Sequence, residues 1–295
     1  MDNELISQLY REYKSLLFSI AYRMTGSASD AEDIVQDVFA QIGKTGVNYM
    51  DNIKALLCKM VTNRCLDLLK SSRKKRELYT GTWLPEPLAL HEEDPLFTIL
   101  NDTSISLAIM ILFEELNPIE RAIFILREVF EYEYPTIAAI VDKSEINCRK
   151  ILSRIKKKLP ELVRKNSIVT DKLEIKNIVT VFMSAFQQGK VNELVHILKE
   201  DVVYYADGGG KATAALHPIY GRKKVFHLLS ALFRKFENNE ENYRLELMNI
   251  NGTTGLALIF ENKIQAVIGF EVGHGQIEAI YYMVNPEKLR YVAEN

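Results

Sequence analysis

A concentration of basic side chains near the middle of the chain is suited to binding phosphate groups. From Lys143 to Lys165 there are nine Lys or Arg residues against two Glu, a local charge of +7. Apolar residues at helical spacing predict a helix over 145–159. Its buried face should hold Ile146, Ile151, Ile155 and Leu159. The remaining faces would then present cations to the phosphates of DNA, an attraction that does not depend on sequence.

The segments before this helix predict how it is positioned. Apolar spacing indicates a helix over 119–130, and Pro135 suits the first turn of a short helix that runs to Val141. The polar break that follows ends in Ser144, a good N-cap residue. A short helix, a turn and a basic second helix place side chains in the major groove. The alternative is a basic helix that simply faces solvent.

Within the predicted recognition helix, position decides the expected role. Early residues should reach base edges, and later cations should bind phosphates. The first group is Glu145, Asn147, Arg149 and Lys150, with Ser144 beside them; the second is Arg154, Lys156 and Lys157.

A second basic helix is predicted over 53–74, well before the first. Between Ile53 and Arg76 there are eight Lys or Arg residues against Asp67 alone, again a local charge of +7. Two separate basic helices indicate a protein that binds nucleic acid at two sites. The alternative is again a solvated basic surface with a polar turn before it.

An acidic helix precedes this second region. Ser29 is expected to cap a helix over 30–42, with acidic residues in its first turn, where the helix dipole favours them. One face is apolar, and the other carries Asp30, Asp33, Gln36 and Asp37. Taken alone, such a face is a solvated surface.

The linker over 77–102 is acidic and contains several prolines. Eight acids and no Lys or Arg occur between Glu86 and Glu120. Such a segment is a solubilising spacer or a mimic of nucleic acid that lies in a basic channel. The only Trp of the chain, Trp83, is in this segment, and an exposed Trp normally finds a pocket, which favours docking.

The last 125 or so residues, from 171 to 295, change character. Two helices are followed by a strand at 202–205, a glycine-rich turn and an amphipathic helix over 223–236. Four strands then follow with turns between them, which predicts an α+β domain with an antiparallel sheet. The expected strands are 243–250, 254–260, 263–272 and 276–284.

Acid–base groups in this last domain raise the question of catalysis. The candidates are Asp207, His217, His227 and Glu271. Catalysis needs such groups aimed into an apolar pocket, and the sequence offers no convincing pair. We therefore expect no enzymatic activity.

The composition excludes several classes of protein. The net charge of the whole chain is −2, so its charges are segregated into regions of one sign. No apolar run is long enough to span a bilayer, and the first residues do not form a signal peptide. Cys58, Cys65 and Cys148 show no metal-ligand spacing and fit reduced thiols in a cytoplasmic protein. We expect no metal and no cofactor.

The first 165 residues resemble the extracytoplasmic-function sigma factors, which are specificity subunits of bacterial RNA polymerase. The resemblance rests on the motifs at 30–39, 56–69, 116–122 and 134–138. It implies a polymerase-docking domain that also reads the −10 element over 1–76, the linker over 77–102, and a helix-turn-helix for the −35 element over 103–165. The implied −10 residues are Asn48, Tyr49, Asn52, Lys59, Asn63 and Arg64.

The resemblance also implies partners. The acidic face of residues 30–37 would dock on the clamp helices of the β′ subunit, and the helix-turn-helix domain would meet the β flap. Promoter DNA is the other partner, and no membrane is involved.

Three further motifs lie at 83–87, 207–211 and 285–289. Together they resemble the sigma-J type, in which a SnoaL-like domain is fused at the C-terminus. This implies a cone-shaped α+β fold over 171–295 that modulates the sigma domains, so that a separate anti-sigma factor is not required. The resemblance leaves open whether this C-terminal domain binds a small-molecule ligand. Glu287 replaces the usual Asp of the last motif. The implied regulatory residues are Trp83, Leu84, Pro85, Glu86, Pro87, Asp207, Gly208, Gly209, Gly210, Asn285, Pro286, Lys288 and Leu289.

Two rival functions remain open. A ligand-responsive helix-turn-helix regulator would explain the basic recognition helix but not the acidic helix or the second basic region. A polyketide-cyclase-like enzyme fused to a DNA-binding part would need a catalytic pair that the sequence does not reveal.

Overall fold

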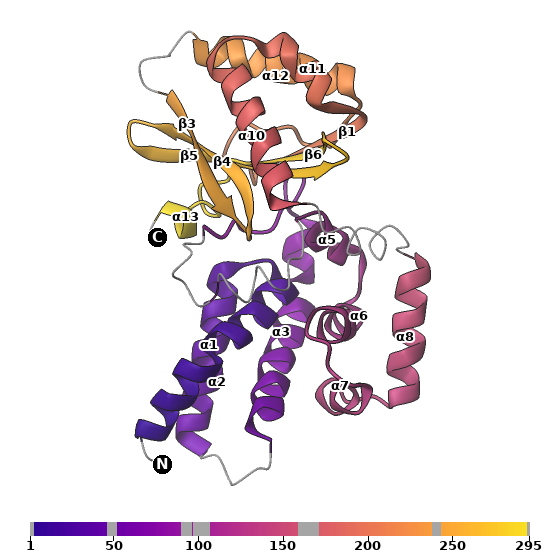
Figure 1. Ribbon diagram of the computed structural model, residues 1–295. Helices are drawn as coiled ribbons and strands as arrows, with labels where there is room; N and C mark the ends of the chain where they lie inside the picture. The colour runs from indigo at the N-terminus through magenta and orange to yellow at the C-terminus, as the bar shows by residue number, and fades with distance from the viewer. Residues whose placement is uncertain are drawn as a thin grey trace. The chain divides into compact units, whose positions relative to one another are not determined.

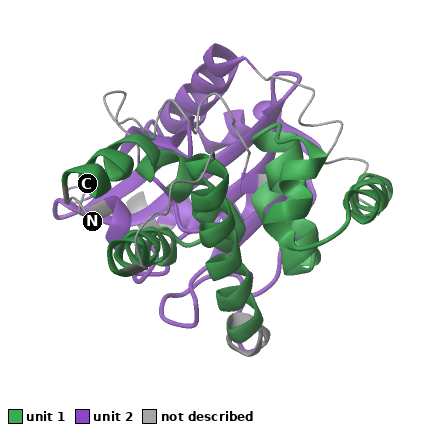
Figure 2. Cartoon of the chain, turned by 90° about the horizontal axis from the view of Figure 1, so that it is seen from below, with its two compact units in different colours: residues 1–77, 92–105, 109–168 green, residues 78–91, 106–108, 169–295 purple. Residues whose placement is uncertain are grey.

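The computed structural model describes residues 3–45, 52–89, 96, 107–158, 171–237 and 243–293. The chain forms two compact units (Figures 1 and 2). Unit 1 comprises residues 1–77, 92–105 and 109–168, and unit 2 comprises residues 78–91, 106–108 and 169–295. The predicted linker is therefore divided between the two, and its first part belongs to the unit that contains the C-terminal domain.

The first helices of unit 1 agree with the spacing of their apolar residues. They are α1 (Asn3–Thr25), α2 (Ala28–Thr45) and α3 (Ile53–Glu77). The prediction that Ser29 caps the second helix was wrong. Ser27 does so instead, because its Oγ accepts a hydrogen bond from the backbone N–H of Asp30 at 3.2 Å, and the helix begins two residues earlier than expected.

The second part of unit 1 is a helix-turn-helix. Its elements are α5 (Leu107–Leu112), the 3-10 turn η1 (Phe113–Glu115), α6 (Pro118–Phe124), the π-turn η2 (Ile125–Val129), α7 (Tyr134–Val141) and α8 (Glu145–Lys158). The first two residues of α5 belong to unit 2. Asn117 and Glu120 form a reciprocal capping box at the start of α6. Asp142 ends α7 in a left-handed conformation, with φ of 53°, and the chain turns sharply into α8.

The two parts of unit 1 are joined by buried polar contacts. The guanidinium of Arg121, in α6, donates to the backbone oxygen of Met24 in α1 at 2.6 Å and to that of Phe113 at 2.7 Å. Cys58 Sγ of α3 lies 3.2 Å from the hydroxyl of Tyr132, just before α7. The hydrogen bonds of Arg121 and the contact between Cys58 and Tyr132 hold the helix-turn-helix against the first helices. Arg23, next to Met24 in the chain, is also buried, which lowers the pKa of its guanidinium to about 9.

Unit 2 is a mixed sheet covered by helices. The helices are α10 (Lys172–Gln187), η3 (Val191–Glu193), α11 (Leu194–Ile197), α12 (Arg222–Glu237) and α13 (Arg290–Ala293). The strands are β1 (Leu198–Asp207), β2 (Ile219–Tyr220), β3 (Tyr243–Ile250), β4 (Thr253–Phe260), β5 (Lys263–Gly273) and β6 (Gln276–Met283). Their order in the sheet is β2-β1-β6-β5-β4-β3.

The sheet departs from the predicted antiparallel pairing at one place. β1 pairs with β6 in parallel, with Tyr204 opposite Ile280, and the short strand β2 was not predicted. The other pairs are antiparallel, as expected. The core lies between the sheet and α10 and α12, and its largest buried side chains include Phe182.

Three observations bear on the classes that the composition excluded. Among the described helices, none combines the length and apolar character needed to cross a bilayer. The three cysteines are buried and free. Within the described part of the chain, no cluster of His, Cys, Asp or Glu is arranged to hold a metal ion.

Candidate nucleic-acid interface and motif cluster

The recognition helix α8 presents a basic face opposite its buried one. Ser144 caps the helix, with its Oγ accepting from the backbone N–H of Asn147 at 3.3 Å. The buried residues are Cys148, Leu152 and Ile155. The predicted burial of Ile146 was wrong, because this side chain is 67% exposed. Ile151 is half-buried, and Leu159 lies outside the described residues.

The cations of α8 differ in what holds them. Arg154 pairs with Glu120 at 2.9 Å, and Lys156 pairs with Glu128 at 2.7 Å. Arg149 lies over the ring of Tyr134, 3.9 Å from its centroid. Lys150 and Lys157 are exposed.

These contacts divide the predicted −35 cations into those that are free to bind DNA and those that are held by other side chains of the protein. Within the described residues, Lys150 and Lys157 have no ion-pair partner, so their charges are available to an external phosphate. Arg149, Arg154 and Lys156 instead attach α8 to the preceding elements of the helix-turn-helix, through Tyr134, Glu120 and Glu128. Glu145 and Asn147 are exposed at the first turn, where a recognition helix reaches base edges.

The predicted −10 residues that the structure describes share one exposed face of α3. Lys59, Asn63 and Arg64 are all exposed, while Val61 and Cys65 beside them are buried. Asn52 caps the helix, its Oδ1 accepting from the backbone N–H of Ala55 at 3.0 Å. Asn48 and Tyr49 lie outside the described residues.

The acidic face of α2 projects away from the core of unit 1. Asp33, Gln36 and Asp37 are exposed, and Asp30 is half-buried. The opposite face is buried and includes Val35 and Val38. These carboxylates therefore form a surface of one sign that a basic partner could contact.

The segment directly after α3 packs into unit 2 in an extended form. We call residues 78–89 the strap. Leu84 and Leu88 are fully buried, Pro85 and Pro87 are also buried, and Trp83 and Glu86 are partly exposed. The tryptophan motif thus supplies hydrophobic anchors to the C-terminal unit, which a solvated spacer would not do.

A buried ion pair holds the centre of the strap. The Asp207 carboxylate is fully buried; its Oδ1 accepts from the Tyr79 hydroxyl at 2.6 Å, and its Oδ2 accepts from the backbone N–H of Leu84 at 2.8 Å and from Lys288 Nζ at 2.7 Å. Lys288 Nζ also donates to the backbone oxygen of Leu84 and lies 4.3 Å from the centroid of the Trp83 ring. The three motifs predicted to regulate the protein therefore meet at one buried carboxylate (we call it the motif cluster).

The glycines after Asp207 allow the chains to approach closely. Gly209 has a φ of 57°, and a Cβ placed on it would lie 2.2 Å from Asn285 Nδ2. That Asn285 nitrogen donates to the Tyr79 hydroxyl at 2.9 Å. A side chain at residue 209 would therefore push the Asn285 motif away from the strap. Gly208 and Gly210 flank it, the latter with a φ of 70° next to Thr80.

The residues of the C-terminal motif at 285–289 differ in their burial. Leu289 is buried, whereas Pro286 and Glu287 are exposed. Glu287 forms an ion pair with Lys211 at the surface, which lowers the pKa of its carboxyl. A second contact lies at the end of the strap, where Leu88 and Asn251 exchange hydrogen bonds of 2.9 Å in both directions.

Sequence reasoning missed two residues of this arrangement, Tyr79 and Asn251. Burial, and then the hydrogen bond to Asp207, raises the pKa of Tyr79, so its hydroxyl remains a proton donor. Tyr79 lies four residues before Trp83, and its aromatic side chain in a polar linker was the available signal. Asn251 lies in a tight turn, with a φ of 54°, and nothing in the sequence tied this turn to the strap.

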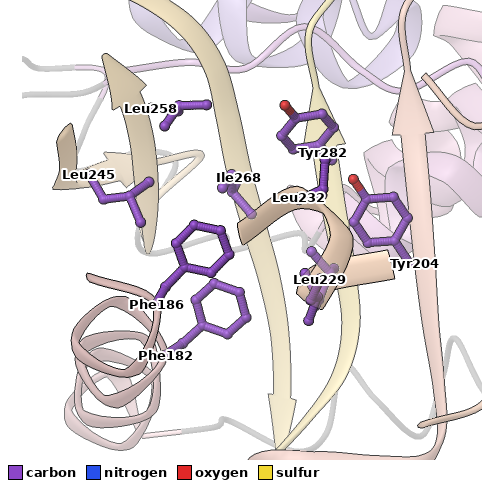
Figure 3. Close-up of a pocket in the computed structure, with 10 residues that line it drawn as sticks. Phe182, Phe186, Tyr204, Leu229, Leu232, Leu245, Leu258, Ile268 and Tyr282 are labelled. Atoms are coloured by element: carbon purple, nitrogen blue, oxygen red, sulfur yellow. The ribbon is translucent and has the colours of Figure 1, made fainter. Parts of the chain in front are cut away.

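A small apolar pocket lies in the core of unit 2 (Figure 3). It holds about 20 Å³ and is lined by apolar side chains together with the rings of Tyr204 and Tyr282. A volume of this size admits roughly one water molecule. None of the four acid–base candidates lines it. Asp207 is engaged in the motif cluster, His217 and His227 are exposed, and Glu271 is partly exposed.

Comparison with known proteins identifies both parts of unit 1. Residues 9–75 match the model of sigma-70 region 2, and residues 106–159 match the model of sigma-70, region 4. The two matched regions contain α8 and all but the last two residues of α3, the two basic helices described above.

Two relatives from Mycobacterium tuberculosis extend the likeness. The ECF RNA polymerase sigma factor SigJ is 30% identical over 285 residues, which cover 92% of this chain and 89% of SigJ. A probable ECF RNA polymerase sigma factor, SigI, is 27% identical over 199 residues, which cover 67% of this chain and 68% of SigI.

The crystal structure of M. tuberculosis SigJ has the same fold. It superposes with a TM-score of 0.77 and 27% sequence identity, covering 96% of this chain and 98% of SigJ. The predicted fold class, two helical sigma regions followed by an α+β domain, is therefore confirmed. The chain belongs to the extracytoplasmic-function family of RNA polymerase sigma factors.

Proposed function

We propose that the chain binds core RNA polymerase and directs initiation at specific promoters, and that its C-terminal unit modulates this activity. The basic faces of α3 and α8, within the two matched sigma-70 regions, carry the proposal. In it, α2 docks on the β′ clamp helices, region 4 meets the β flap, α3 holds the −10 strand and α8 reads the −35 element.

The experiment that tests this function is transcription from a candidate promoter with purified core polymerase. Transcription should start at the promoter only when the protein is added. A ligand-responsive regulator, the rival function, would instead bind the duplex without polymerase. Specific duplex binding by the protein alone, with no promoter-dependent transcription, would contradict the proposal.

The exposed face of α3 that carries Lys59, Asn63 and Arg64 gives a prediction that distinguishes phosphate contacts from base contacts. Lys59→Ala and Arg64→Ala should each reduce the slope of log affinity against log salt by about 0.7 to 1, because each cation releases one counterion. Asn63→Ala should leave this slope unchanged and alter the preference among −10 sequences. Binding of the holoenzyme to promoter DNA, measured over a salt series, gives the slopes.

Lys14→Ala serves as the control for this series. Lys14 is an exposed cation on α1 that lies near the ring of Tyr10, which packs on Phe39 of α2. Its removal should change neither the slope nor the sequence preference. Equal slopes for the wild type and the two α3 variants would show that α3 does not contact phosphates.

We also propose that the strap and the motif cluster regulate the sigma regions. The strap directly follows α3 in the chain, and its anchors are Asp207 and Lys288 of unit 2. The C-terminal unit therefore limits the path by which the chain leads from region 2 to region 4. In this proposal it replaces a separate anti-sigma factor and acts without catalysis.

Truncation tests the regulatory proposal. A chain that ends at Val284 lacks Lys288, and a chain that ends at Thr170 also lacks Asp207, so both should alter transcription output relative to the full chain. The measurement is run-off transcription with core polymerase at matched protein concentration. If neither truncation changes the output, the C-terminal unit has no regulatory role.

A further inference from the structure

One apolar side chain lies at the N-terminal start of the basic face of the recognition helix. Ile146 is 67% exposed at the second residue of α8. With 3.6 residues per turn, it shares a side of the helix with Lys150, Ser153 and Lys157. The buried residues Cys148, Leu152 and Ile155 lie on the opposite side.

Exposed apolar residues are common, so exposure alone assigns no role. The position of Ile146 carries the argument. The first residues of a recognition helix are the ones that contact base edges in the major groove. Its exposed neighbours Asn147 and Lys150 are polar or basic, and Lys150 and Lys157 supply the positive charge that draws this face onto DNA.

The major groove offers few groups that an apolar side chain can match. Guanine, cytosine and adenine present hydrogen-bond donors and acceptors there, and thymine alone adds a C5-methyl group. A branched aliphatic side chain at this position is complementary to that methyl group. Facing a polar edge instead, it would desolvate the base without returning a hydrogen bond.

We propose that Ile146 determines promoter specificity by packing against the C5-methyl group of a thymine in the −35 element. The inference rests on the proposed function, since it requires α8 to lie in the major groove of promoter DNA. The charged residues around Ile146 would then fix the register of the helix, and Ile146 would select thymine at one base pair.

Replacing that thymine by deoxyuridine tests the contact, because this change removes only the methyl group. The −35 sequence is first selected from a randomised promoter library with the holoenzyme. The affinity of the holoenzyme is then measured on promoters with T or dU at each selected thymine. The dU substitution should weaken binding about fourfold, the effect of one buried methyl group, and Ile146→Ala should weaken it at least as much.

The two changes should not add. Ile146→Ala should bind the T and dU promoters equally, and Ile146→Val, which keeps the branched methyl groups, should retain part of the preference for T. Lys157→Ala is the matched control on the same face. It should weaken binding to both promoters and leave the T-to-dU ratio as in the wild type.

Several outcomes overturn the inference. One is a selected −35 element without thymine, and another is an undiminished T-to-dU ratio in Ile146→Ala. Loss of core polymerase binding in that variant would assign Ile146 to a protein interface instead. A wild-type holoenzyme that selects no −35 sequence would overturn the proposed function as well. Promoter-specific binding with independent effects of the two changes would overturn this inference alone.

Discussion

Asp207→Asn should lower the free energy of unfolding of unit 2 by about 3–5 kcal/mol, the cost of leaving one member of a buried ion pair without its partner. All three groups that contact the Asp207 carboxylate are donors, namely the Tyr79 hydroxyl, the Leu84 N–H and Lys288 Nζ. A carboxylate accepts from all of them, whereas the amide of Asn must turn a donor toward one. The variant also leaves the buried ammonium of Lys288 without its counter-charge.

Trp83 provides a local readout of this prediction. It is the only tryptophan of the chain, and the Lys288 ammonium lies 4.3 Å from its ring centroid. Urea unfolding followed by tryptophan fluorescence therefore reports on the strap. In Asp207→Asn the transition should move to lower urea concentration, and hydrogen exchange at the Leu84 amide should become faster.

A second ion pair between the same two segments supplies the matched control. Lys211 and Glu287 pair at the surface, with about half of each side chain exposed. Solvent-exposed pairs contribute about 0–1 kcal/mol, so Glu287→Gln should leave the fluorescence transition nearly unchanged. Equal shifts for Asp207→Asn and Glu287→Gln would show that the buried carboxylate does not hold the strap.

The same variant connects stability to regulation. If the strap restrains the sigma regions, Asp207→Asn should change transcription output in the same direction as the truncation at Val284, since both remove the Asp207–Lys288 pair. Glu287→Gln should transcribe like the wild type. A destabilised strap with unchanged transcription would make the motif cluster structural only.

Local patterns carried most of the fold prediction. The amphipathic spacing of α1, α2 and α3, the proline at the start of α7 and the turns between β3, β4, β5 and β6 are short-range signals, and each appears in the structure. The errors arose where short-range rules offered two choices. Ser27 and Ser29 are both good caps, and the one that lies before the first turn of backbone hydrogen bonds caps α2.

Ile146 shows a second kind of ambiguity. The residues Ile146, Ile151 and Ile155 have helix-like spacing, so they were predicted to share the buried face. The true buried face runs through Cys148, Leu152 and Ile155, and treating Cys148 as apolar would have favoured it. The mistaken residue is also the one to which we assign a base contact, because a functional side chain breaks the pattern that packing imposes.

Contacts between segments far apart in the chain could not be predicted from short-range sequence patterns. β1 pairs in parallel with β6, with α12 and four strands between them in the chain, and no local signal fixes such a pairing. The motif cluster is similar, since Tyr79 and Asp207 are 128 residues apart. The resemblance to a family marked these motifs, but only the fold shows that one buried carboxylate joins them.

Reversing two charges on α2, Asp33→Lys with Asp37→Lys, should weaken binding to core RNA polymerase by at least about 100-fold, because like charges facing each other at an interface cost several kcal/mol. Both carboxylates are exposed, and the residues that pack α2 into unit 1, including Val35 and Val38, are untouched. The variant should therefore keep the circular dichroism spectrum and thermal stability of the wild type. Pull-down with core polymerase and a binding titration measure the loss.

Glu193→Lys with Glu261→Lys is the control for total charge. Both residues are exposed in unit 2, and the double reversal changes the net charge by the same amount. It should bind core polymerase like the wild type, because electrostatic attraction acts here through the facing surfaces and is screened beyond about 10 Å at ordinary salt. Intact binding by Asp33→Lys with Asp37→Lys would contradict the docking role of α2, and equal loss in both double variants would reduce it to an effect of net charge. Loss confined to the α2 variant would identify its acidic face as the polymerase-binding surface.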